Sequence, residues 1–194
     1  MQERRLRLTG VPARDRFGPL TSSNVAKSAV GDADHRLRPA TAADERAIGA
    51  IWVPGWREAH EGRVPDALLE HRSAGDLRGR VASMIEATTV AEIDGAVAGF
   101  VVVRDDCVDQ MYVGEAHRGT GAAGSLLADA ESAIAARHER AWLAVVAGND
   151  RARRFYERRG WHDEGLFDHL TWTTDGRTIA VPCRRYEKDV GHPS

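Results

Sequence analysis

The chain has 194 residues, 42% of them hydrophobic, which is enough for one domain with a sizeable core. The 27 Lys and Arg residues against 29 Asp and Glu residues give a net charge of -2, so no basic field would attract nucleic acid. Two isolated cysteines, and histidines without paired spacing, indicate neither a disulfide framework nor a metal site.

Nothing in the sequence predicts a membrane protein. No apolar run approaches the roughly 20 residues that span a bilayer, and the basic start MQERRLRLTG is not followed by an apolar signal core. We therefore expect a cytoplasmic protein that does not bind membranes.

Residues 1–34 differ in composition from the rest, being rich in Arg, Ser, Gly, Pro and Ala without sustained periodicity. We interpret them as a disordered N-terminal extension, and we place the folded domain at residues 35–190. A basic arm for a partner and a start codon chosen too far upstream are the alternatives.

The folded part begins with a strand and a helical region. Residues 35–41 read as the strand, and Thr41 followed by acidic residues is a plausible helix start. The helical region carries Trp52 and Trp56, and we expect it to be interrupted at Pro54-Gly55.

Strands dominate after a second helical region that follows Pro65. Residues 88–104 form two strands joined at Asp94-Gly95, a hairpin signal because Gly tolerates the positive φ of tight turns. The strand CVDQMYV over residues 107–113 comes next, and a helix is expected over residues 119–137.

The last third adds a buried strand, AWLAVVA, a helix opened by Asn149, and two strands around an Asp175-Gly176 turn. The order is strand, helices, three strands, helix, strand, helix and two strands. This order predicts an α/β fold with a central mixed sheet and one parallel crossover.

A glycine-rich segment connects the 107–113 strand to the following helix. Gly119, Gly121 and Gly124 satisfy the G-x-G-x-x-G dinucleotide fingerprint. A doubly wound domain, however, passes almost directly from its first strand into the glycines and continues with several βα units. Here five residues intervene, and one helix and a hairpin remain after the second parallel strand. Ser125 also follows Gly124 directly, without the Lys of a P-loop.

The same glycines form a helix start that suits negative charge. Small residues from Gly119 to Gly124 leave backbone N–H groups and the positive end of the helix dipole open to a phosphate. Arg118 adds a fork of donors. Tight packing of a small-residue helix on a sheet would explain the same glycines, and both interpretations can hold.

Two motifs at their mutual spacing resemble the GCN5-related N-acetyltransferase (GNAT) family. RGTGAA, residues 118–123, matches its R/Q-x-x-G-x-G/A motif, and NDRARRFYERRGW, residues 149–161, matches its second conserved region. The closing VPCRRYEK is similar to the last strand of many bacterial members. The resemblance covers about residues 35–190 and departs at Gly114-Glu115, where many relatives have Pro. It implies the GNAT acyl-CoA N-acyltransferase fold, with two splayed parallel strands and flanking helices.

The resemblance implies acetyl-CoA as the cofactor, with its pantetheine arm lying like an added strand between the splayed strands. The pyrophosphate would then lie on the N–H groups of residues 119–124. The cofactor-binding residues that follow are Met111, Tyr112, Val113, Arg118, Gly119, Thr120, Gly121, Ala122, Ala123, Gly124, Asn149, Ala152 and Tyr156.

The resemblance also implies that the substrate amine attacks the acetyl carbon directly in a ternary complex, without an acyl-enzyme. The Val113 N–H would polarise the carbonyl, and Tyr156 would protonate the departing thiolate. The base that takes the amine proton is left open between Asp109 and Glu115. For Tyr156, a role in completing the core is the alternative.

In relatives the first helices and the last hairpin form the acceptor site, which points to Trp52, Trp56, His60 and Tyr186 as substrate-binding residues. For the aromatic residues on helices, a place in the core is the alternative. The net negative charge slightly favours a cationic amine as the acceptor. The rival hypothesis is a non-catalytic acyl-CoA-binding or regulatory module. The oligomeric state is left open, with a homodimer as one option.

Overall fold

The computed structural model describes residues 35–191, and the predicted N-terminal extension lies outside the described residues. A seven-stranded sheet with the order β1-β2-β3-β4-β5-β7-β6 forms its centre. Neighbouring strands are antiparallel except β4 and β5, which confirms the predicted mixed sheet with one parallel crossover. The strands are β1 (Arg36–Pro39), β2 (Thr88–Ile93), β3 (Ala96–Arg104), β4 (Cys107–Val113), β5 (Arg140–Val146), β6 (His162–Trp172) and β7 (Thr178–Asp189).

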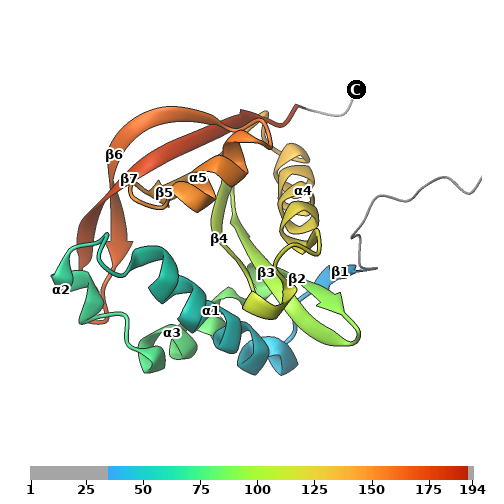
Figure 1. The fold of residues 1–194 in the computed structure, drawn as a ribbon, viewed down its shortest axis with the longest axis horizontal. Coiled ribbons are helices and arrows are strands. Elements are labelled where there is room, and N and C mark those ends of the chain that lie inside the picture. Colours follow the sequence, from blue (N-terminus) through green and yellow to red (C-terminus); the bar gives the residue numbers. More distant parts are fainter. Residues whose placement is uncertain (1–34, 192–194) are drawn as a thin grey trace, which may run out of the picture. The chain divides into compact units, whose positions relative to one another are not determined.

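Helices cover both faces of this sheet (Figure 1). Three precede β2, one connects β4 to β5, and one connects β5 to β6. The α-helices are α1 (Glu45–His60), α2 (Asp66–Leu69), α3 (Ala74–Val81), α4 (Ala122–Ala135) and α5 (Asp150–Glu157), with short 3₁₀ helices η1 (Ala42–Asp44), η2 (Ala82–Ala87) and η3 (Glu115–His117).

Two hydrophobic clusters lie on opposite faces of the sheet. One contains Leu126 and Ile134 of α4 together with Tyr156 of α5. The other contains Trp52 of α1 and Leu77 of α3. The central strands contribute to both clusters, because successive strand side chains point to opposite faces.

Helix α1 runs unbroken through Pro54 and Gly55, so the predicted interruption there is wrong. A proline in a helix interior costs about 3 kcal/mol, but the flanking Trp52 and Trp56 are both buried in the core. Gly55 faces the ring of Tyr112, where an added Cβ would lie 2.6 Å from Cδ1. Burial of this helix face outweighs the local propensity and brings α1 directly onto β4.

Helix α4 starts later than the predicted 119–137 helix, at Ala122, and ends at Ala135. The reason is the backbone before it, because Gly119 and Gly121 have φ angles of 82° and 92°. These left-handed conformations are readily available to glycine alone and form a turn ahead of the helix.

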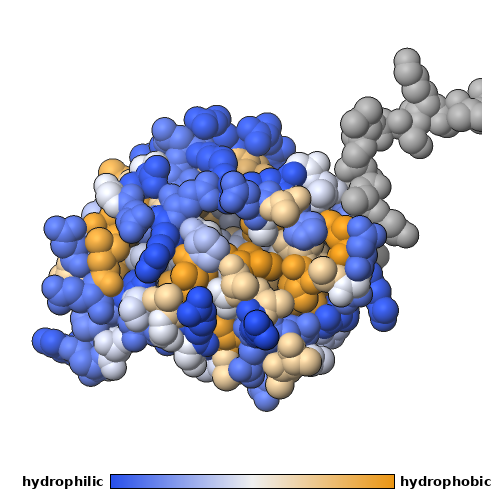
Figure 2. Space-filling model, turned by 60° about the horizontal axis from the view of Figure 1, so that its bottom comes forward, coloured by the Kyte–Doolittle hydropathy of each residue, from blue (hydrophilic) through white to orange (hydrophobic). Residues whose placement is uncertain are grey.

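The face shown in Figure 2 has apolar residues gathered towards its middle, with hydrophilic residues around them. In the described part of the chain, Leu166 and Leu170 of β6 are the large hydrophobic side chains that stand exposed. None of the helices among residues 35–191 is both long and apolar enough to cross a bilayer.

Candidate active site

The parallel strands β4 and β5 meet at one end and separate towards the other. Their register contains a single pair, Cys107 with Trp142, and the Trp142 amide donates to the Asp106 carbonyl at 3.0 Å. No further residue pair joins β4 to β5 within the described chain. The centre of the sheet therefore has a gap that widens towards the C-terminal end of β4.

Main-chain groups of β4 face this gap. The Gly114 amide donates to the Ala98 carbonyl at 2.8 Å, beside the Gly99–Val113 pair. Since hydrogen-bonded and non-hydrogen-bonded pairs alternate along an antiparallel ladder, the N–H and C=O groups of Met111 and Val113 point away from β3 and towards β5. An extended ligand in the gap could pair with them as an added strand.

Strand β4 also contains a β-bulge at Asp109. Val102 pairs with Gln110 and Val103 pairs with Val108, which leaves Asp109 as the extra residue. A bulge bends its strand and redirects side chains. The Asp109 carboxylate forms an ion pair with Arg104 at 3.3 Å and lines a cavity beside the gap.

A cavity of about 560 Å³ follows the glycine-rich turn and α5. All the residues that we predict to bind the cofactor line it except Thr120. The Thr120 hydroxyl instead donates to the His117 carbonyl at 2.8 Å, within the turn that precedes α4. We call this space the cofactor cavity.

Glycine at position 124 leaves room for an arginine side chain at the floor of the cofactor cavity. A Cβ at Gly124 would collide with the Arg159 guanidinium, which lies across the first turn of α4. Gly121 precedes the first helical residue, Ala122, and its carbonyl accepts from the amides of Gly124 at 2.8 Å and Ser125 at 3.2 Å. The helix thus presents its N-terminus to the cavity without bulky side chains.

Four arginines line the same cavity, namely Arg118, Arg151, Arg158 and Arg159. The Glu58 carboxylate of α1 reaches two of them, forming ion pairs with Arg118 and, at 2.9 Å, with Arg151. This arrangement concentrates positive charge beside a helix N-terminus and suits a ligand with several phosphate groups.

Tyr156 lies where the cofactor cavity meets a second one. Asn149 is the N-cap of α5, as predicted, and its Oδ1 accepts from the Ala152 amide at 3.2 Å. One turn later Tyr156 is 8% exposed and packs edge-on against Trp161. Burial raises the pKa of Tyr156 well above its usual value, so the phenol keeps its proton at neutral pH.

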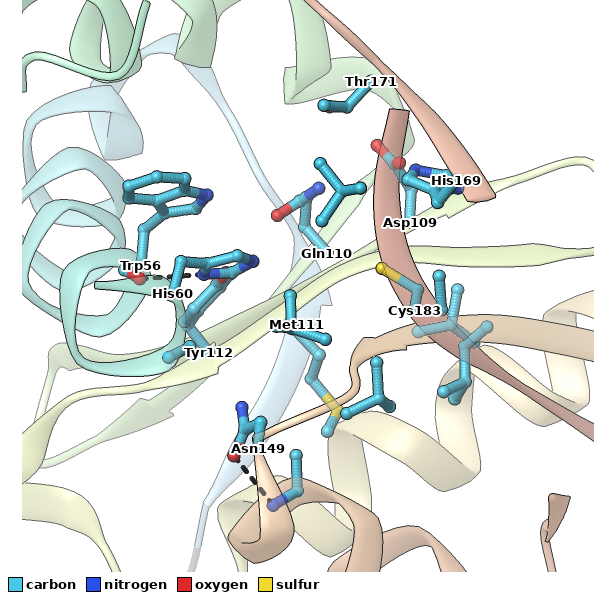
Figure 3. Close-up of a pocket in the computed structure, with 18 of the residues that line it drawn as sticks. Trp56, His60, Asp109, Gln110, Met111, Tyr112, Asn149, His169, Thr171 and Cys183 are labelled. Atoms are coloured by element: carbon cyan, nitrogen blue, oxygen red, sulfur yellow. Dashed lines mark hydrogen bonds between the residues drawn. The ribbon is translucent and has the colours of Figure 1, made fainter. Parts of the chain in front are cut away.

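The second cavity, of about 160 Å³, shares six lining residues with the first, namely Ala59, Met111, Tyr112, Asn149, Ala152 and Tyr156. It extends between α1, the bulged part of β4 and the β6–β7 hairpin, and we call it the acceptor cavity. Figure 3 shows Trp56 and His60 on one side of it, Asp109 and His169 on the other, and Gln110 between them.

The predicted acceptor residues Trp52, Trp56 and His60 all line the acceptor cavity. The rings of Trp56 and His60 stack at 4.5 Å with an interplanar angle of 4°. Burial lowers the pKa of His60 to about 4, so its imidazole is neutral at pH 7.

Tyr186 and Glu115 lie away from both cavities. Tyr186 is completely buried on the other face of β7, where its hydroxyl donates to Glu157 at 2.8 Å and accepts from Arg153 at 3.3 Å. The alternation along β7 explains this position, because Cys183 faces the acceptor cavity and Tyr186, three residues on, faces the opposite side. Glu115 is an exposed residue at the start of η3.

Sequence reasoning missed several residues of the acceptor cavity. Arg72, between α2 and α3, meets Thr171 and Trp172 at the tip of the β6–β7 hairpin, about 100 positions later in the chain. His169 and Gln110 line the same cavity. No motif or periodicity marks these residues, because tertiary structure alone brings them together.

Comparisons with known proteins agree with this geometry. The model of the acetyltransferase (GNAT) family matches residues 45–161, which is more than half of the chain. No curated protein matched. Among solved structures, the chain resembles a GCN5-related N-acetyltransferase from Rhodopseudomonas palustris, with a TM-score of 0.61 and 18% identity over 79% of this chain and 94% of that one.

Two further similar structures contain acetyl-CoA. One is yncA, a putative acetyltransferase from Salmonella typhimurium, with a TM-score of 0.59 and 16% identity over 83% of this chain and 96% of that one. The other is a phosphinothricin acetyltransferase from Sinorhizobium meliloti, with a TM-score of 0.58 and 18% identity over 81% and 89%. At such identities these structures support the fold, and the family match carries the assignment. The chain belongs to the acetyltransferase (GNAT) family.

Proposed function

We propose that the chain is an N-acetyltransferase that transfers the acetyl group of acetyl-CoA to a primary amine by direct attack in a ternary complex. The observation that carries this proposal is that the two cavities adjoin and share lining residues. A cationic, glycine-lined cavity meets a smaller one at Tyr156, and the two share residues of β4 and α5. A long phosphorylated cosubstrate and a small acceptor would thus meet at this junction.

The residues of the cofactor cavity fit acetyl-CoA. The four arginines and the start of α4 offer positive charge to its phosphates, and the main chain of Met111 and Val113 offers pairing groups to its pantetheine arm. When bound, acetyl-CoA supplies an acyl group activated as a thioester. The Val113 N–H is then the donor available to the acyl oxygen, a kind of contact that lowers an acyl-transfer barrier by roughly 3 kcal/mol.

Tyr156 is the residue that we propose as the general acid. Its buried phenol holds a proton at neutral pH, and it stands at the junction of the two cavities. From this position the hydroxyl can hydrogen-bond to a departing thiolate and give it that proton.

Asp109 is the base that we favour. It lines the acceptor cavity, whereas Glu115 lines neither cavity. From the bulge of β4 its carboxylate can take the proton of an acceptor amine, directly or through water.

Direct attack is favoured over an acyl-enzyme by the state of the cysteines. Cys107 and Cys183 both line the acceptor cavity. Burial, however, raises the pKa of Cys107 to about 12 and that of Cys183 to about 11. Both thiols are protonated at neutral pH, and the thiol form is a poor nucleophile.

The test measures CoA release from acetyl-CoA across a panel of amines, amino acids, aminoglycosides and peptides. We expect transfer to at least one acceptor, and calorimetry should show tighter binding of CoA thioesters than of NAD or FAD. Binding of acetyl-CoA without transfer to any acceptor would support the rival regulatory module instead.

Gly121→Glu tests the cofactor cavity separately. The new carboxylate would stand at the α4 N-terminus and repel a phosphate there. Because Gly121 has φ 92°, Gly121→Ala carries the same backbone strain without the charge and is the matched control. Equal affinity of the two variants for acetyl-CoA would show that the turn does not bind phosphate.

A further inference from the structure

Arg72 is a buried cation in the wall of the acceptor cavity. It is 4% exposed and lies between α2 and the N-cap of α3. Its guanidinium lies over the Trp172 ring, with Cζ 3.5 Å from the ring centroid, and 6.0 Å from the centroid of Trp56. The aromatic rings fix its plane and its position.

The hydrogen bonds of Arg72 go to neutral groups. Nη1 donates to the His71 carbonyl at 2.9 Å, and Nη2 donates to the Thr171 hydroxyl at 3.0 Å and the Trp172 carbonyl at 2.7 Å. Among residues 35–191 no carboxylate forms an ion pair with Arg72, and its Nε–H has no acceptor there. Buried arginines are normally paired, because taking an unpaired charge out of water is costly.

The other charges around the cavity do not supply the missing anion. Asp109 is the one carboxylate among the described residues that line the cavity, and it pairs with Arg104. Glu70, the nearest acid in sequence, is exposed, and the half-buried Asp76 accepts from the Ser73 amide at 2.9 Å as part of the cap of α3. Asp76 acts on the charge of Arg72 without forming an ion pair with it. The cavity therefore has one buried cation without an anionic partner.

Arg72 lies towards one end of the acceptor cavity. Thr171, its hydrogen-bond partner, lies across the cavity from Asn149 in Figure 3. Asn149 belongs to the part of the wall shared with the cofactor cavity. Arg72 thus marks the end that is remote from the transfer site, and an acceptor anchored there would extend its other end towards Tyr156.

We propose that Arg72 binds a carboxylate of the acceptor, and that the acceptor is an amino acid whose amino group receives the acetyl group. Both Nη2 hydrogens are engaged by Thr171 and Trp172, which leaves the Nε–H and one Nη1 hydrogen of Arg72 to donate a charge-assisted hydrogen bond to a carboxylate. A cationic amine without an acid group, which the net charge of the chain slightly favours, would leave Arg72 unpaired. This inference rests on the proposed function, since it names the substrate class of the same site.

The test compares each amino acid with two matched acceptors, its carboxamide and the amine left after decarboxylation. We expect kcat/KM of the wild type for the best amino acid to exceed that for either partner by roughly thirtyfold or more, the range for removing one member of a buried charge pair. Arg72→Met should abolish this preference, and Arg72→Lys should retain part of it.

Arg80→Met is the matched control. The Arg80 guanidinium also stacks on Trp172, 4.3 Å from the ring centroid, but Arg80 does not line the acceptor cavity. Its loss should leave the preference for the carboxylate intact. If Arg72→Met fails to fold, the wild-type comparison of acids with their amides tests the substrate class, and Arg72→Lys tests whether Arg72 binds the carboxylate.

Equal kcat/KM for acids, amides and decarboxylated amines would overturn the inference while leaving the acetyltransferase proposal standing. If no acceptor at all is acetylated, the proposed function fails, and calorimetry with the same matched sets then decides the role of Arg72. Amino acids that bind more tightly than their amides to wild type, and not to Arg72→Met, retain the inference. Equal or absent binding overturns it and leaves Arg72 as a structural link to the hairpin.

Discussion

At the scale of single residues, Tyr156 owes its proposed role to burial. The ring packs between Trp161 and Phe155, and the same burial that raises its pKa keeps the hydroxyl in its donor form. The ring of Tyr156 thus provides the packing, and its hydroxyl provides the proposed proton transfer. The sequence alone suggested this tyrosine through the α5 motif, but its place between two cavities depends on residues of β4 and β6–β7.

Tyr156→Phe separates the two functions of this residue. The variant keeps the ring and removes the hydroxyl, so we expect kcat to fall at least about tenfold, the low end of the loss when a positioned acid is removed. The acetyl-CoA dissociation constant and the Tm should stay close to wild type. Steady-state kinetics under conditions where the chemical step limits turnover provide the measurement.

Tyr186→Phe is the matched control for that experiment, because Tyr186 is a buried tyrosine outside both cavities. Removing its hydroxyl breaks the bonds to Glu157 and Arg153 and should lower the Tm, with kcat and KM unchanged. If Tyr156→Phe turns over at the wild-type rate, Tyr156 has a role in packing and not in catalysis. If Tyr186→Phe has a lower rate, Tyr186 contributes to the acceptor site after all.

At the scale of elements, α1 connects the two cavities. Its Trp56 and His60 line the acceptor cavity, while Glu58, between them in sequence, reaches the arginines of the cofactor cavity. A carboxylate is a smaller analogue of a phosphate in charge and geometry, so Glu58 holds Arg118 and Arg151 in an arrangement that a phosphate would compete for.

Glu58→Gln should therefore tighten acetyl-CoA binding. The ion pairs are partly exposed, and pairs of this kind contribute about 0.2–1 kcal/mol, so the expected gain in affinity is up to about fivefold. Glu61→Gln, an exposed acid just past the end of α1, is the control and should have little effect. Calorimetric titration at low and high salt checks the result, and weaker binding of Glu58→Gln would contradict it.

The ends of helices and strands were predicted well where nearby residues in the sequence determine them. They were predicted less well where tertiary packing determines them. Asn149 caps α5 as expected, because a side-chain acceptor at that position satisfies a free amide of the first turn. The Asp94-Gly95 turn joins β2 and β3 for the same local reason. The interruption predicted at Pro54-Gly55 was wrong, because helix propensities do not include the free energy gained by burying Trp52 and Trp56.

At the scale of the whole molecule, the acceptor cavity is made of segments far apart in the chain. Arg72 and the hairpin tip at Thr171 and Trp172 are about 100 positions apart in the chain and meet only in the folded structure. The side of the sheet that Tyr186 occupies likewise depends on the register of a long strand, where a difference of one residue reverses the face. Sequence motifs pointed to residues of the cofactor cavity because these lie in three short stretches, and they could not point to a cavity assembled from many distant parts.

Stability should depend on pH through His60. Its folded pKa is about 4 against an ordinary value of 6.5, so the unfolded chain binds more protons than the folded chain between these two values. The contribution of His60 to the free energy of unfolding is complete above about pH 6.5 and is lost as the pH falls towards 4.

His60→Phe should flatten the dependence of the Tm on pH in that window, because a phenyl ring can stack on Trp56 and cannot be protonated. Thermal unfolding of wild type and variant between pH 4 and 7 provides the comparison. His162→Phe, at an exposed histidine, serves as the control. Parallel profiles for wild type and His60→Phe would show that another group governs the acid side.

Because a single residue pair joins β4 to β5, the main chain at the centre of the sheet is weakly held in the apo protein. The sheet is divided into a half with β1–β4 and a half with β5–β7, and one pair of hydrogen-bonded positions lies on the seam between them. The amides of Met111 and Val113 should then exchange with deuterium much faster than those of Tyr112, which is paired with Phe100. A cosubstrate that fills the seam would slow their exchange and act, in mechanical terms, as the missing eighth strand of the sheet.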